Sequence, residues 1–148
     1  MTAPDAADPA RFVDHVGIVV ADADAAAGLF AGRFGLEVEH DEVVDDVGVR
    51  LVYLAGSDHG VPAAIQLVEP LGPGPIKDHL DQRGEGMHHI CLAVADLDAT
   101  LAAQGGESSA RVFSGGRGRR TCFLAGQTCG SLIELSEVEA PQQRGGAQ

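Results

Sequence analysis

Two segments of this chain resemble each other closely enough to indicate an internal duplication. One reads HVGIVVADADAA from His15, and the other reads HICLAVADLDAT from His89. Aligned on these histidines, the segments share further Val, Ala and Asp residues, and most other pairs are apolar in both. The two copies also end alike, in IQLVE around Gln66 and IELSE around Glu134. Such self-similarity predicts two copies of one supersecondary unit that share a core.

The first copy predicts a strand, a helix and three further strands. Residues 13–20 form a continuous apolar run rich in β-branched side chains, which is typical of a buried strand. Apolar residues then recur at helical spacing as far as Phe34, with Asp22 as the predicted N-cap and Gly35 as the stop. Strand-like runs follow at 36–44, 47–55 and 62–69.

The second copy repeats this order after a connector rich in proline and glycine. The connector reads PLGPGP, and a short helix is predicted just after it, at 76–82. A strand at 87–94 and a helix at 96–104 come next. The remaining predicted strands lie at 110–113, 119–124 and 131–137.

These patterns predict an α+β fold built from two tandem βαβββ modules. The end segments are rich in Ala, Pro, Gln and Gly without any periodicity, so we expect flexible tails. The predicted parts are an N-terminal tail at 1–11, a first module at 12–69, a linker with a short helix at 70–86, a second module at 87–138 and a C-terminal tail at 139–148.

The charge of the chain excludes some classes of partner. A formal net charge of -12 with one lysine, Lys77, argues against a nucleic-acid partner and against an anionic membrane surface. Basic residues cluster only at Arg117, Arg119 and Arg120, which are candidates for a small substrate-binding anion site. A solvated, arginine-rich hairpin is the alternative for these three residues.

The cysteines and the apolar runs bear on location. Three cysteines without CxxC spacing favour free thiols in a reducing compartment. The N-terminal segment has acidic residues where a signal peptide has basic ones, and no apolar run approaches the roughly 20 residues needed to span a bilayer. We therefore expect a cytoplasmic protein that has no membrane partner.

The two copies place chemically useful side chains at equivalent positions. If the modules pair about a pseudo-twofold axis, His15, Gln66, His89 and Glu134 converge. Two imidazoles, an amide oxygen and a carboxylate suit a divalent transition metal, whereas a structural zinc site would use thiolates. Single histidines beside apolar strands are often core residues, but a carboxylate buried in such a strand needs compensation. We predict one divalent metal on these four ligands, with two positions open for substrate oxygens. His88 is expected to point to the opposite face of its strand from His89, which disfavours it as a ligand; it could support the ligands from behind or lie at the surface or an interface.

The chain resembles the vicinal oxygen chelate (glyoxalase/bleomycin resistance/dioxygenase) superfamily, and within it the methylmalonyl-CoA epimerases. The matching motifs are VDHVGIVV at 13–20, IQLVEPLG at 65–72, GEGMHHICLAV at 84–94 and SLIEL at 131–135. The resemblance implies a cupped mixed sheet around the predicted metal site. It also implies cobalt as the usual metal, although the ligand set suits nickel, manganese, iron or zinc as well.

The resemblance implies an epimerase or racemase that acts on a 2-substituted malonyl thioester through a stabilised enolate. Glu134 is the expected catalytic acid/base. Some similar epimerases carry a second glutamate just after a Gly-Val pair, where this chain has Leu51, which cannot move a proton. Glu42, Asp45 or Asp46 could replace it, or these residues could form a solvated acidic turn.

The chain departs from the epimerases in a second place. Related epimerases often have a His-Pro-Lys segment before the last strand, whereas this chain reads LAGQTCG at 124–130. The expected substrate is a small molecule that could carry coenzyme A, with the three clustered arginines binding its phosphates. Chains of this resemblance are commonly homodimers, which we expect here too.

Two other classes of function remain open. One keeps the metal cup for a glyoxalase-type lyase or isomerase, a dioxygenase, or a diverged enzyme of specialised metabolism. Gln66 disfavours a dioxygenase, because a fourth protein ligand takes a position that dioxygen and substrate need. The other class is a non-catalytic protein that binds or sequesters small molecules, and the complete ligand set argues against it.

Overall fold

A computed structural model describes residues 9–58, 63–104 and 111–139. The predicted tails lie mostly outside these ranges, as do the start of the predicted strand at 62–69 and the start of the one at 110–113. The predicted order of elements is otherwise confirmed. In the first module these are β1 (Phe12–Val19), α1 (Ala23–Phe34), β2 (Glu37–Val44), β3 (Val49–Ala55) and β4 (Ala64–Pro70).

The second module follows the connecting helix and repeats the first with shorter strands at its edge. Its predicted edge strand is reduced to two residues and is followed by a short 3-10 turn. The elements are α2 (Pro75–Arg83), β5 (Gly86–Val94), α3 (Leu97–Ala103), β6 (Phe113–Ser114), η1 (Gly116–Gly118), β7 (Arg120–Phe123) and β8 (Ile133–Glu137).

The module helices begin at equivalent aspartates, as the repeat predicts. The side chain of Asp22 accepts a hydrogen bond from the backbone N–H of Ala25, and Asp96 accepts one from Ala99, each at 3.0 Å. Gly35 ends α1 in the left-handed conformation, with φ of 69°, which costs glycine little. Local capping therefore positions both helices directly after the strands that carry the histidines.

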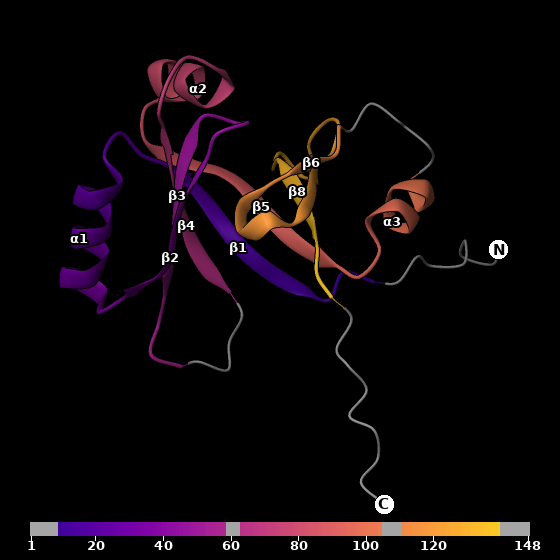
Figure 1. The fold of residues 1–148 in the computed structure, drawn as a ribbon, viewed down its shortest axis with the longest axis horizontal. Helices are drawn as coiled ribbons and strands as arrows, with labels where there is room; N and C mark the ends of the chain where they lie inside the picture. Colours follow the sequence, from indigo (N-terminus) through magenta and orange to yellow (C-terminus); the bar gives the residue numbers. More distant parts are fainter. Residues whose placement is uncertain (1–8, 59–62, 105–110, 140–148) are drawn as a thin grey trace, which may run out of the picture.

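All eight strands form one curled sheet in the order β2-β3-β4-β1-β5-β8-β7-β6. The first strands of the two modules, β1 and β5, pair antiparallel at its centre, and each has the last strand of its own module as a parallel neighbour. Figure 1 shows α1 at the left beside the strands of the first module, α3 at the right beside those of the second, and α2 at the upper left above β3. This arrangement relates the modules by the expected pseudo-twofold.

Three apolar clusters hold the sheet and helices together. One packs α1 against β3 and β4 around Leu54 and Leu67, and its counterpart packs α3 against the second module around Leu97. The third lies on the other face of the sheet, where Ile76 and Leu80 of α2 cover Leu51 and its neighbours. Within the described ranges, no helix is both long and apolar enough to cross a membrane.

Candidate metal centre

The four predicted ligands come from the four central strands and lie on one face of the sheet. His15 is on β1, Gln66 on β4, His89 on β5 and Glu134 on β8. Their exposed fractions are 3, 3, 5 and 8%. The structure therefore brings together, in a buried setting, side chains that lie far apart in the sequence.

Three of these side chains meet closely enough to share one ion. His15 Nε2 lies 3.2 Å from His89 Nε2 and 3.2 Å from Glu134 Oε1, and His89 Nε2 lies 3.6 Å from the same carboxylate oxygen. Such nitrogen and oxygen atoms are ordinary ligands of a divalent transition metal. His15, His89 and Glu134 thus form a candidate set of metal ligands.

Gln66 reaches the site with its amide held by Tyr53. Gln66 Nε2 donates to the hydroxyl of Tyr53 at 2.8 Å, from a position directly opposite on β3. The carbonyl oxygen of the amide is then the atom that can bind a metal. Tyr53 also packs its ring edge-on to His15, with the centroids 5.6 Å apart.

Two bulges in the central strand pair give His15 and His89 each a hydrogen-bond partner. The register between β1 and β5 skips Asp14 at one shift and His88 at the other. Extra residues of this kind break the alternation of a strand. Asp14 Oδ2 lies 2.7 Å from His15 Nδ1, and His88 Nδ1 lies 2.8 Å from His89 Nδ1. The expectation that His88 faces away from His89 is therefore wrong.

Burial and hydrogen bonding set the protonation of the site. Burial favours neutral His15, but hydrogen bonds to Asp14 and Glu134 outweigh it and raise the pKa of His15 above its ordinary value. Burial likewise opposes ionisation of Glu134, yet its hydrogen bond to His15 lowers its pKa. His89 lacks such a close carboxylate partner, so burial lowers its pKa to about 4. The pKa shifts of His15 and Glu134 favour an ion pair between them, whose facing atoms are 3.2 Å apart.

This donor set fits a divalent cation. Glu134 is a buried carboxylate that faces two imidazole nitrogens, and a cation between them would compensate its charge better than one shared proton. The outer nitrogens of both imidazoles are already bonded to Asp14 and His88. A carboxylate such as Asp14 is a usual partner of a metal-binding histidine in proteins.

The three clustered arginines all pair with carboxylates. Arg119 Nη1 donates to Asp14 Oδ1 at 2.8 Å, and Arg117 Nη1 lies 3.5 Å from the other oxygen of Asp14. Arg117 also stacks over Tyr53, with Cζ 4.1 Å from the ring centroid. Arg120 pairs with the exposed Asp98. Two of the arginines thus support the residues around His15, and a role of all three in substrate binding stays a prediction.

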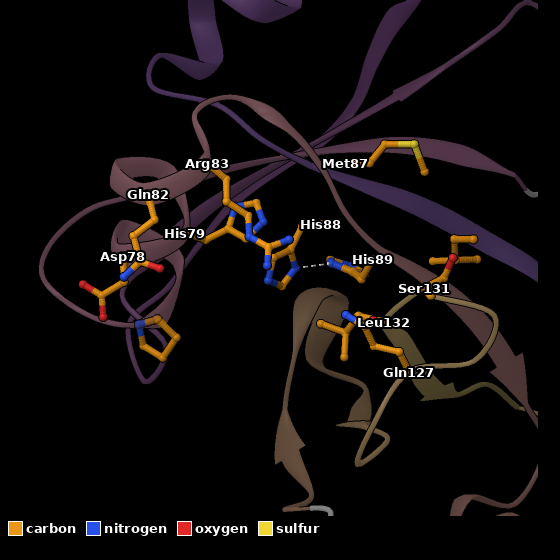
Figure 2. A pocket seen from close by; sticks show the side chains of 13 residues that line it. Asp78, His79, Gln82, Arg83, Met87, His88, His89, Gln127, Ser131 and Leu132 are labelled. Atoms are coloured by element: carbon orange, nitrogen blue, oxygen red, sulfur yellow. Dashed lines mark hydrogen bonds between the residues drawn. The ribbon is translucent and has the colours of Figure 1, made fainter.

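Two cavities adjoin the ligands. A small one of about 60 Å³ is bordered by Gln66, His89 and Glu134 and has Leu51 in its wall. A larger one of about 380 Å³ lies on the other side of His89. Figure 2 shows His79 and Arg83 of α2 on one side of it and Gln127, Ser131 and Leu132 on the other.

Sequence reasoning missed Asp14, Tyr53 and Gly17. Asp14 had a usable signal, because it is a charged residue inside an apolar strand and is only 3% exposed. Tyr53 had none, since its contact with Gln66 depends on strand register. Gly17 lies opposite His89, and a Cβ built there would be 2.1 Å from His89 Cε1. A side chain at position 17 would therefore displace the ring of His89.

Comparisons with known proteins identify the family of this chain. A model of the glyoxalase/bleomycin resistance protein/dioxygenase superfamily matches residues 14–123. The ethylmalonyl-CoA/methylmalonyl-CoA epimerase of Cereibacter sphaeroides is 34% identical over 137 residues, with 85% of this chain and 97% of that protein covered.

Solved structures of methylmalonyl-CoA epimerases are also similar to this chain. The methylmalonyl-CoA epimerase of Mycobacterium tuberculosis is 37% identical with a TM-score of 0.74, covering 87% of this chain and 88% of that one. A Streptomyces coelicolor methylmalonyl-CoA epimerase variant in complex with 2-nitronate-propionyl-CoA is 35% identical with a TM-score of 0.73, covering 86% and 97%. The chain belongs to the glyoxalase/bleomycin resistance protein/dioxygenase superfamily and, within it, to the methylmalonyl-CoA epimerases.

Proposed function

We propose that this protein is a divalent-metal-dependent epimerase of a 2-substituted malonyl thioester, with His15, Gln66, His89 and Glu134 as the metal ligands. The observation that carries the proposal is the convergence of these four buried side chains from both modules. Membership of the epimerase family supports the same activity. A cation held there supplies positive charge that stabilises the enolate formed when the C2 proton is lost.

Glu134 is the proposed catalytic acid/base. Its carboxylate is buried and borders the small cavity, where it is placed to accept a proton from C2. Asp14 and His88 hold the two imidazoles in place. Leu51, Phe113 and Phe123 line the same cavity and exclude water from the reacting carbon.

The finer assignments are parts of this proposal. Cobalt is the proposed metal. The protein is proposed to be cytoplasmic and to form a homodimer. Coenzyme A is the proposed handle, because a related epimerase is known in complex with methylmalonyl-CoA. The cavity of about 380 Å³ beside His89 offers room for the thioester arm. We also propose that Arg117, Arg119 and Arg120 attract its phosphates, in addition to their carboxylate contacts.

One experiment tests the activity directly. The metal-loaded protein is incubated in deuterated water with methylmalonyl-CoA, and deuterium at C2 and the ratio of epimers are followed by NMR. We expect both exchange and inversion, and we expect His15→Ala and Glu134→Ala to lose metal and activity together. If the metal-loaded protein neither exchanged nor inverted a panel of such thioesters, the proposed function would be wrong.

A further inference from the structure

Epimerisation needs a proton to leave one face of C2 and another to arrive on the opposite face. Glu134 lies on β8, so it serves one face only. Across the small cavity from Glu134, the lining includes Leu51 of β3. Leucine has no proton to give, so the second proton has to come from a residue nearby.

Glu42 is the ionisable residue that the strand register places beside Leu51. Glu42 on β2 and Leu51 on β3 are direct partners across an antiparallel pair, so both side chains lie on the face that carries Gln66. A Cβ added at Gly116, which lines the cavity, would be 2.9 Å from Leu51 Cδ1 and 3.3 Å from Glu42 Oε1. The same Cβ would be 2.1 Å from the hydroxyl of Tyr53, so the carboxylate of Glu42 lies beside the cavity, behind its wall residue Gly116 and next to Leu51 and Tyr53.

Glu42 also lies beside a partly exposed imidazole. His40 Nε2 lies 3.5 Å from Glu42 Oε2, and the side chain of His40 is 41% exposed, against 24% for Glu42. An imidazole can carry protons between water and a carboxylate near neutral pH. A group in this position can be reprotonated between turnovers while the cavity stays covered.

We infer that Glu42 is the second acid/base of the reaction, in place of the leucine at position 51; this inference rests on the proposed function. The carboxylate of Glu134 takes the proton from C2, and the electron pair of that C–H bond moves into the enolate. Protonated Glu42 then gives its proton to the opposite face, which forms the new C–H bond and restores the carbonyl. Both carboxyl groups return to their starting states by proton exchange with water, and the roles reverse for the other epimer.

Glu42 also has a structural contact, which decides the choice of variant. Glu42 Oε1 accepts a hydrogen bond from the backbone N–H of Arg117 and so anchors η1 to β2. The substitution Glu42→Gln keeps an oxygen that can accept this bond but cannot transfer a proton. Glu37→Gln is the matched control, because it makes the same chemical change at an exposed position of the same strand.

The test follows exchange and inversion separately for each epimer in deuterated water. For Glu42→Gln we expect inversion to fall by about 10²–10⁴-fold, the usual contribution of a general acid or base. The bound metal, measured by elemental analysis, and the melting temperature should stay unchanged. C2 exchange should persist for the epimer whose proton faces Glu134 and be lost for the other. Adding Leu51→Glu to this variant should restore inversion.

Other results would overturn the inference. Equal loss of exchange for both epimers would mean a structural role for Glu42, and unchanged inversion would mean no role. Loss of inversion in Tyr53→Phe with one-sided exchange retained would assign the proton to the phenol instead. A wild-type protein that neither exchanges nor inverts would refute the proposed function itself, which is a different outcome from a defect confined to Glu42→Gln.

Discussion

Gly17 lies against the ring of His89, so replacing it with alanine is a local test of the metal centre. A Cβ at position 17 would be 2.1 Å from His89 Cε1 and 2.6 Å from Nε2. The ring therefore has to retreat by about 1.3 Å to reach the ordinary contact distance of 3.4 Å. Metal–ligand distances tolerate only about 0.2 Å. His89 would then no longer coordinate the metal.

We expect Gly17→Ala to make the free energy of metal binding less favourable by more than it lowers the free energy of unfolding. Changes to residues behind a ligand weaken metal binding by about 10–100-fold, so loss of the ligand itself should cost at least about 100-fold, or about 2.7 kcal/mol. The fold loses less, because the overlap is with a side chain that can swing aside. Overpacking costs about 1–3 kcal/mol, and this substitution should lie near the low end of that range.

The assay is calorimetric titration of the metal-free protein with Co²⁺, with the visible spectrum of the bound ion recorded in parallel. Gly28→Ala in α1 is the control, because a Cβ there meets nothing within 4 Å. It should leave metal affinity unchanged and stabilise the protein by up to about 1 kcal/mol, since glycine is a poor helix former. Wild-type affinity and an unaltered cobalt spectrum in Gly17→Ala would refute the assignment of His89 as a ligand.

Three further predictions concern the surroundings of the site. Asp14→Asn should weaken metal binding by about 10–100-fold in the same titration while the fold is retained, because the residue orients His15; an unchanged affinity would contradict that role. The pKa of His15 is raised by hydrogen bonds to Asp14 and Glu134, so its proton competes with the metal. Affinity should therefore rise with pH above 6.5, and calorimetry in buffers of different ionisation heat should detect proton release. Burial raises the pKa of the Cys91 and Cys122 thiols, so only Cys129 should react with a thiol reagent in the native protein and all three in denaturant.

Sequence patterns predicted most of the fold because the signals involved are local. Asp22 and Gly35 bound the first helix by direct contact with its ends, and the apolar runs that precede the helices marked the central strands. The prediction was poorest at 110–113, where the strand is reduced to Phe113–Ser114. Short edge strands have little periodicity, so their bounds depend on the neighbouring strand.

For the candidate site too, the sequence predicted some features and only the structure showed others. The repeat identified His15 with His89, and Gln66 with Glu134, as equivalent residues, which was enough to predict their convergence. It could not show that Arg119 holds Asp14 or that Gln66 is bonded to Tyr53. Those contacts join residues whose separation in the chain carries no signal.

The sequence by itself determined the two-module architecture and the set of candidate ligands, because duplication, strand pattern and residue chemistry are written along the chain. Tertiary structure alone decided how the ligands are held. Bulges brought Asp14 and His88 to the two histidines, and register placed Glu42 beside Leu51. These features depend on how strands align and curl against one another, and a shift of one residue would send each side chain to the opposite face.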